Sequence, residues 1–96
     1  MVKLNFEQFR LPIGVSGKNE RTGDVRESFA DIVYMSATGV KAHHLAFKIY
    51  ESNGAIEYSD EEVTLIVATA EHYCTPSFID GLKRQIENNP DNKQQP

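Results

Sequence analysis

The sequence has no tryptophan, a single cysteine and no long hydrophobic run. A lone cysteine, Cys74, cannot form an intrachain disulfide, and no charged-then-apolar leader or lipidation signal is present. The apolar stretches fall far short of the ~20 residues that a transmembrane helix needs. These absences predict a cytoplasmic protein in a reducing compartment, with no membrane association.

Positive charge is also scarce, with 10 Lys and Arg against 14 Asp and Glu and a net charge of -4. This balance excludes the broadly basic surface that is typical of a nucleic-acid-binding protein. Residues 1–50 carry a net charge of +2 and residues 51–96 one of -6, and no Lys or Arg lies between Glu51 and Asp80. The asymmetry predicts a negative face that attracts a basic partner. A solvated acidic surface that only maintains solubility is the alternative interpretation.

A chain of 96 residues has room for one small domain and excludes a multidomain enzyme. We expect one globular domain over residues 1–87. Residues 88–96 have almost no apolar content, which predicts a disordered C-terminal tail. Such a small core gives marginal stability, so a homodimer that completes the core across a twofold axis is an open possibility.

Alternation of apolar and polar residues predicts extended structure near the N-terminus. The apolar positions of two successive runs are Val2, Leu4 and Phe6, then Phe9, Leu11, Ile13 and Val15. Pro12 has no amide hydrogen, so the second run is an edge strand or merely extended chain. The polar and glycine-containing residues 16–23 predict an exposed loop.

Apolar spacings of three and four predict four helices further along the chain. The first follows Asp24 and stops at Gly39, and the second runs from about Val40 to Ser52. Residues 55–58 are a short connector or a brief strand. We therefore predict a mainly α protein of the α+β class, in which an N-terminal extended segment or β-hairpin packs on a small four-helix domain.

The third and fourth helices have the clearest local start signals. Ser59 and Glu62 have the spacing of a capping box, and Asp60 and Glu61 favour the positive end of the helix dipole. Thr75 followed by Pro76 is a cap with proline at the first helical position. These signals explain the acidic run 60–62 without catalysis or metal binding.

Few residues are candidates for chemistry. His43 and His44 are adjacent and would point about 100° apart on a helix, so they cannot grip one metal ion together. His72 and Cys74 also lack a helical spacing, although Cys74 lies just before a helix start, where a thiol can become reactive. We expect no metal, no cofactor, no catalytic residue and no enzymatic activity.

The third and fourth helices together have roughly the length of a helix-turn-helix. The third helix carries four acidic residues and no Lys or Arg, so the phosphate contacts that support DNA affinity are missing. Nucleic-acid binding is therefore unfavoured, and it would depend on Arg10, Arg21 and Arg26.

Four helices are predicted between Arg26 and Glu87. The second contains the pattern LA-x-KIY, and the third begins with a cap of the pattern S-x-E-E. The matching positions are Leu45, Ala46, Lys48, Ile49, Tyr50, Glu57, Ser59, Glu61, Glu62, Leu65 and Ile66. In this order the sequence resembles small uncharacterised open reading frames of tailed bacteriophages and prophages. The resemblance implies a bacterial mobile-element origin and a small interaction protein, with no activity to carry over.

The function predicted from the sequence is that of a non-enzymatic protein-protein interaction module that binds its partner through an acidic face. The residues expected on that face are Glu57, Asp60, Glu61 and Glu71, with Tyr50 and Tyr58 as aromatic anchors. The alternative interpretation for both tyrosines is that they are buried in the core. A homo-oligomeric structural protein and a nucleic-acid accessory factor are the alternative functions.

Overall fold

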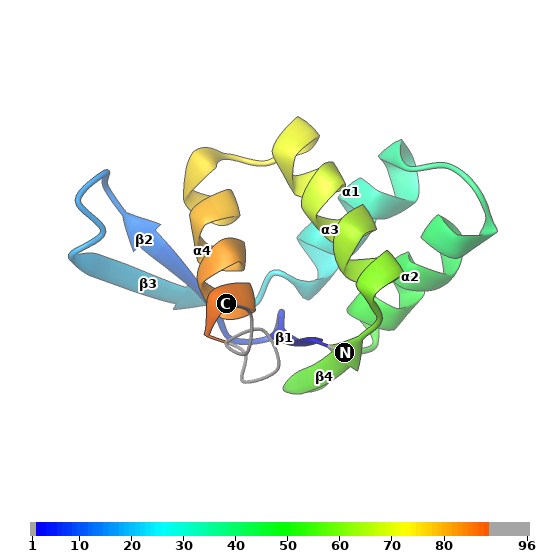
Figure 1. The fold of residues 1–96 in the computed structure, drawn as a ribbon, viewed down its shortest axis with the longest axis horizontal. Coiled ribbons are helices and arrows are strands. Elements are labelled where there is room, and N and C mark those ends of the chain that lie inside the picture. The colour runs from blue at the N-terminus through cyan, green and yellow to red at the C-terminus, as the bar shows by residue number, and fades with distance from the viewer. Residues whose placement is uncertain (1, 89–96) are drawn as a thin grey trace.

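The computed structural model describes residues 2–88 and contains four helices and four strands in that part of the chain (Figure 1). In chain order they are β1 (Val2–Asn5), β2 (Phe9–Ile13), β3 (Asn19–Gly23), α1 (Arg26–Ser36), α2 (Val40–Tyr50), β4 (Ala55–Tyr58), α3 (Asp60–Tyr73) and α4 (Pro76–Glu87). The strands form two small antiparallel sheets, so the fold is mixed α+β and not a purely four-helix domain. The predicted tail lies outside the described residues, apart from Asn88.

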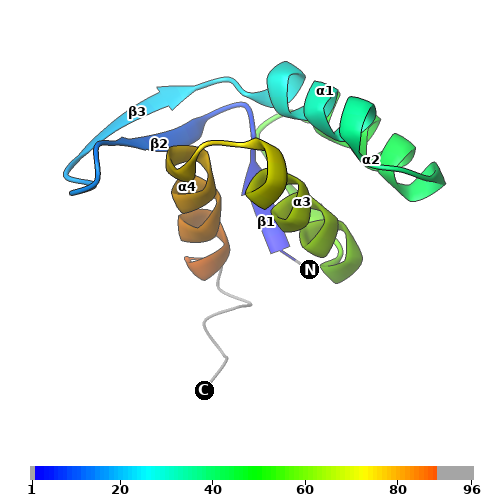
Figure 2. The same ribbon diagram turned by 90° about the horizontal axis from the view of Figure 1, so that it is seen from above.

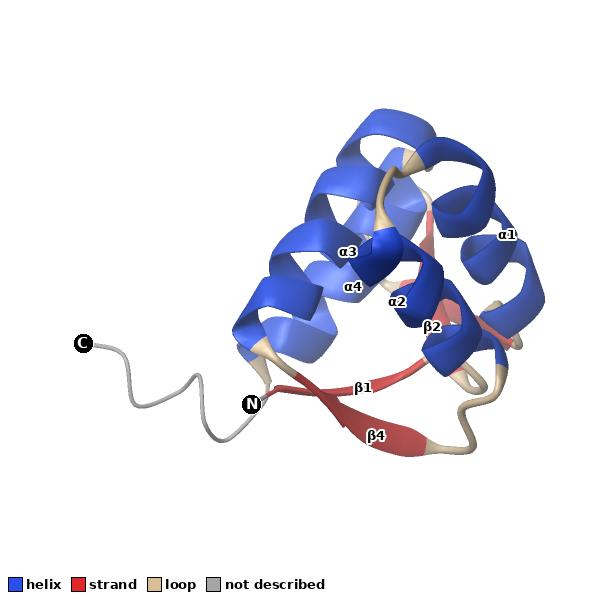
Figure 3. Ribbon diagram, turned by 90° about the vertical axis from the view of Figure 1, so that its right-hand side faces the viewer, coloured by secondary structure: helices blue, strands red, loops and turns tan. Residues whose placement is uncertain are grey.

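The first sheet joins segments that are distant in sequence. β1 pairs with β4 in a register that runs from Val2 opposite Tyr58 to Asn5 opposite Ala55, and the pair lies along one side of the helices (Figure 3). Residues 55–58 are therefore a strand, which was one of the two alternatives that the sequence left open. The N-terminal strand does not pair with its neighbour β2.

The second sheet is a hairpin of β2 and β3, with Phe9 opposite Gly23 and Ile13 opposite Asn19. The prediction of a loop over residues 16–23 was wrong in part, because residues 19–23 form β3. Their polar side chains gave no alternating pattern because β3 is the outer strand of the hairpin, with four of its five residues exposed, and β2 is the strand that packs on α4 (Figure 2). The exposure expected of this segment is confirmed for all but Gly17 and Gly23, which are half-buried.

The predicted helix starts are formed as expected in α3 and α4. The Ser59 amide donates to Glu62 Oε1 (2.8 Å) and the Glu62 amide donates to Ser59 Oγ (3.2 Å), which completes the capping box. Thr75 Oγ1 accepts from the Phe78 amide (3.3 Å). At α1 the N-cap is Val25, while Asp24 Oδ1 accepts from the Arg26 amide (3.0 Å).

One aromatic cluster forms the centre of the core. Phe6 stacks on Phe29 with ring centroids 5.4 Å apart, Phe9 stacks on Phe78 at 4.6 Å, and Tyr58 meets Phe6 edge to face. Buried aliphatic side chains from β1 and from α2, α3 and α4 surround these rings; they include Leu4, Leu45, Ile49, Ile66 and Leu82. Burial of these residues closes a core within one chain.

Helix α4 contacts both sheets and links them. The Gln85 side chain accepts from the Asn5 amide (2.8 Å) and donates to the Asn5 carbonyl (3.1 Å), so it pairs with β1 as a further strand would. Ser77 Oγ donates to the Pro12 carbonyl (2.6 Å). A Cβ atom at Gly81 would collide with the carbonyl oxygen of Arg10, so glycine is what allows α4 to lie so close to β2.

Candidate functional site

The structure separates the acidic residues that the sequence predicted as one face. Glu57 is exposed on β4, and Asp60 and Glu61 are exposed in the first turn of α3. Glu71 lies eleven residues beyond Asp60 on the same helix, which is about 16 Å along the axis. Glu57, Asp60 and Glu61 therefore lie close together along the chain, and Glu71 lies apart from them.

Lysines from neighbouring helices neutralise part of this acidic surface. Lys41 binds Glu61 (2.9 Å) and Lys83 contacts Glu71 (3.6 Å). The lysines of α2 and α4 therefore offset only part of the negative charge between residues 51 and 80. Among the described residues, the carboxylates of Glu57 and Asp60 have no ion-pair partner.

The two tyrosines of the predicted site lie in different environments. Tyr58 is fully buried in the aromatic core, with Lys48 Nζ 4.7 Å from its ring centroid, so it takes the core position that the sequence left as the alternative. Burial, together with the charge of Glu62, raises the pKa of Tyr58 to about 12, while the Ser52 hydroxyl opposes this shift. Tyr50 is 53% exposed and lies on α2, away from the acidic residues of α3.

A surface that the sequence analysis did not single out lies between α1 and α2. We define the α1–α2 face by its side chains at spacings of four and three on each helix: Glu27, Asp31 and Tyr34 on α1, and His43, Phe47 and Tyr50 on α2. The ring of Phe47 meets Tyr34 edge to face at 6.0 Å and His43 at 5.0 Å. Phe47 is the only one of the five phenylalanines that is not buried.

The helices leave a cavity of about 250 Å³ on this face, lined by residues from both helices. Its apolar walls are Ala30, Ala46 and the rings of Tyr34, Phe47 and Tyr50, and its polar rim consists of Glu27 and Asp31. Small-molecule and cofactor sites occupy about 300–1,000 Å³, so this cavity suits a single inserted side chain better than a cofactor.

No basic residue lines this cavity. The two lysines of α2 extend toward α3 instead, where Lys41 binds Glu61 and Lys48 binds Glu62 (2.8 Å). Among the described residues, the Glu27 and Asp31 carboxylates take part in no hydrogen bond or ion pair. The α1–α2 face therefore combines exposed aromatic rings with two carboxylates that lack an internal counter-ion.

The nearest arginine is occupied in the fold. Arg26 Nη2 binds Asp24 Oδ2 (2.7 Å), and Arg26 Nη1 donates to the Ser52 carbonyl (2.8 Å). The side-chain hydrogen bond from Arg26 is the main reason that the pKa of Asp24 is lowered. Arg26 thus links the start of α1 to the end of α2, and its charge is satisfied within the chain.

The remaining candidates for chemistry are not brought into a site. Burial raises the pKa of the Cys74 thiol, which opposes activation by the following helix. His72 Nδ1 lies 3.1 Å from the Ala68 carbonyl of its own helix. Within residues 2–88, no three His, Cys, Asp or Glu side chains gather where they could hold a metal ion.

Comparisons of the chain with protein-family models, with curated proteins and with solved structures found no match. None of the helices within residues 2–88 is both long enough and apolar enough to cross a membrane.

One sequence signal could have identified the α1–α2 face. Tyr34 falls outside the apolar stripe that predicts α1, and Phe47 falls outside the stripe that predicts α2, which consists of Ala42, Leu45, Ala46, Ile49 and Tyr50. An aromatic residue off the buried stripe, in each of two consecutive helices, indicates a second apolar surface. Contact between the rings of Tyr34 and Phe47 depends on how the two helices pack, and this packing cannot be predicted from the pattern.

Proposed function

We propose that this chain is a non-enzymatic protein-binding module of phage or mobile-element origin. Its α1–α2 face receives a partner segment in which a lysine or arginine lies between apolar side chains. The observation that carries the proposal is the meeting, on one exposed face, of aromatic rings with carboxylates that have no counter-ion in the described chain.

Each component of the face has a physical reason to bind such a segment. Exposed aromatic rings gain free energy when they are covered, and tyrosine is enriched among the residues that dominate binding energy. A cation over Tyr34, Phe47 or Tyr50 gains a cation–π interaction, and Glu27 or Asp31 supplies the opposite charge. A partner with an apolar segment alone would leave these carboxylates desolvated and unpaired.

The same charges disfavour a second copy as the occupant. A twofold dimer places identical patches against each other, so the α1–α2 faces of two copies would bring four carboxylates together without a lysine or arginine on that face. Like charges in one interface cost several kcal/mol. We therefore expect light scattering to give the mass of a single chain, 10.8 kDa, at all accessible concentrations.

The experiment is capture of partners from host lysate, with and without nuclease, by the tagged chain and by matched variants. Phe47→Ser and Asp31→Lys change the α1–α2 face, while Glu57→Lys and Asp60→Lys change the two acids of the sequence-predicted face that have no ion pair. All four positions are exposed, so the variants should keep the fold. We expect the first two to lower the affinity of the captured protein by about 30-fold each, as hot-spot substitutions do, and the last two to leave it nearly unchanged.

Two results would refute this assignment. Loss of binding with Glu57→Lys and Asp60→Lys, but not with Phe47→Ser, would place the interface on the acidic residues that the sequence predicted. A complex that disappears on nuclease treatment would make the chain a nucleic-acid accessory factor.

A further inference from the structure

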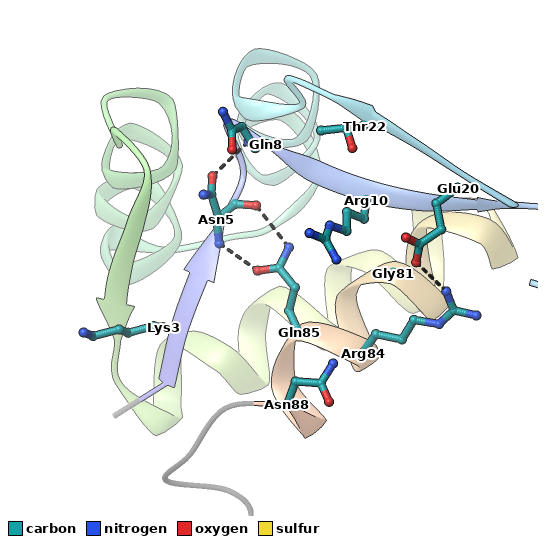
Figure 4. A pocket seen from close by; sticks show the side chains of 10 residues that line it. All are labelled: Lys3, Asn5, Gln8, Arg10, Glu20, Thr22, Gly81, Arg84, Gln85 and Asn88. Carbon is teal, nitrogen blue, oxygen red and sulfur yellow. Dashed lines mark hydrogen bonds and ion pairs between the residues drawn. The ribbon is translucent and has the colours of Figure 1, made fainter. Parts of the chain in front are cut away.

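A pocket of about 480 Å³ opens between α4 and the strands β1, β2 and β3, on another part of the molecule than the α1–α2 face (Figure 4). We propose that it binds a phosphate group, either as inorganic phosphate or as the phosphate of a small organic ester. This inference is independent of the proposed protein-binding function.

The charges that line the pocket are positive overall, in a chain whose net charge is -4. Lys3, Arg10 and Arg84 line it, and Glu20 is its only carboxylate, so the lining sums to +2. Arg84 Nη1 binds Glu20 Oε2 (2.8 Å). The guanidinium of Arg10 makes no hydrogen bond or ion pair with any described residue, and in Figure 4 it points into the pocket between Gln85 and Glu20.

Several hydrogen-bond acceptors of the pocket are already occupied, whereas Arg10 has no acceptor among the described residues. Gln85 Oε1 and Asn5 Oδ1 already accept hydrogen bonds from backbone amides, and the Asn5 carbonyl accepts from Gln85. The five N–H groups of Arg10 and the hydroxyl of Thr22 remain as donors without a described acceptor. A guanidinium binds phosphate oxygens through two parallel hydrogen bonds, so a phosphate group would supply the acceptors that the Arg10 guanidinium lacks.

The fold holds the walls of the pocket in place without a ligand. Gly81 allows the close approach of α4 to the Arg10 backbone, and the bidentate contact of Gln85 with Asn5 fixes α4 against β1. Gly17 leaves room for the Arg84 guanidinium beside the hairpin loop, where it reaches Glu20. The two arginines are thus presented from a helix and a strand that pack together, which lowers the cost of ordering them on binding.

The test is an NMR titration of backbone amides with inorganic phosphate, adenosine monophosphate and adenosine, at constant ionic strength maintained with sodium chloride. We expect saturable shifts around Thr22 and Gly81 with the two phosphates and none with adenosine. Arg10→Gln should weaken phosphate binding by about tenfold or more. Glu20→Gln should tighten it, because it removes the only carboxylate and releases Arg84. Arg21→Gln, on the same hairpin but outside the pocket lining, is the matched control and should change nothing.

Each outcome has a definite meaning. Equal affinity for the two phosphates would show that a free phosphate suffices, and tighter binding of the nucleotide would show that the ligand carries a further group; both support the pocket. The absence of saturable shifts, or equal weakening by Arg10→Gln and Arg21→Gln, would overturn it. A single-stranded oligonucleotide that binds far more tightly than the nucleotide, and is weakened equally by both substitutions, would also overturn it in favour of a diffuse nucleic-acid surface.

Discussion

At the scale of single residues, Tyr58 combines complete burial with an ionisable group. Its hydroxyl has no hydrogen-bond partner of good geometry among the described residues, since Ser52 Oγ donates to the Ile49 carbonyl (2.7 Å). The ring packs on Phe6 and lies beside Lys48. Its role is therefore apolar packing, and the hydroxyl adds little to stability near neutral pH.

Ionisation of Tyr58 predicts a loss of stability in alkali. Below about pH 10 the hydroxyl is protonated in the folded and unfolded states. Above that pH the unfolded state releases the proton, while the folded state keeps it up to its pKa of about 12. The folded state then binds more protons, so the free energy of unfolding falls as pH rises, by a total of about 2–3 kcal/mol.

Urea unfolding of the wild type and of Tyr58→Phe, from about pH 8 to pH 12, measures this effect. The phenylalanine variant cannot ionise at this position, so we expect it to become the more stable of the two as pH rises. Parallel stability curves for the two proteins would show that Tyr58 is accessible to water in the folded state.

Residue burial was predictable where one apolar stripe defines a helix face, as for Leu45, Ile49, Ile66 and Leu82. It was not predictable for tyrosine, which suits both a core and an interface. Tyr58 is buried because β4 pairs with β1 under the helices, and Tyr50 is exposed because its side of α2 borders the cavity between α1 and α2 and not the core. Both outcomes depend on tertiary packing.

At the scale of elements, local signals predicted the ends of helices better than they predicted the sheets. The caps at Ser59 and Thr75 involve residues three positions apart, so the sequence contains the whole interaction. Pairing of β1 with β4 joins segments about fifty residues apart, and β3 has no apolar alternation because no core covers it. The ion pairs of Glu61 and Glu71 could not be predicted for the same reason, since the lysines that bind them lie on α2 and α4.

The contact between α4 and the hairpin predicts that Gly81→Ala destabilises the protein. Alanine in a helix is favoured over glycine by about 1 kcal/mol, but here its Cβ atom would meet the Arg10 carbonyl and the Phe9 ring. Overpacking against backbone costs about 1–3 kcal/mol, so the clash should outweigh the propensity.

Gly23→Ala is the matched control for urea unfolding, because a Cβ atom at Gly23 would meet no atom within 4 Å. We expect Gly81→Ala to lose stability and Gly23→Ala to stay within about 0.5 kcal/mol of the wild type. A Gly81→Ala variant more stable than the wild type would mean that α4 does not pack tightly on β2.

At the scale of the whole molecule, the two surfaces proposed for binding are separated in space. The hairpin and α4 lie toward one end of the longest axis, which measures 38 Å, and α1 and α2 lie toward the other (Figure 1). The first is lined by Lys3, Arg10 and Arg84, and the second by Glu27 and Asp31. The charge asymmetry between the sequence halves thus does not describe the surface. Residues 1–50 supply Lys3 and Arg10 of the pocket as well as the carboxylates of the α1–α2 face, and residues 51–96 supply Arg84.

Hydrogen–deuterium exchange of the chain, free and bound to its captured protein partner, tests the proposed function most directly. Because partner binding covers the α1–α2 face, we expect slower exchange in α1 and α2, residues 26–36 and 40–50, with β4 and the first turn of α3 unchanged. Protection confined to β4 and the start of α3, with no change in α1 and α2, would contradict the proposal and return the interface to the acidic residues.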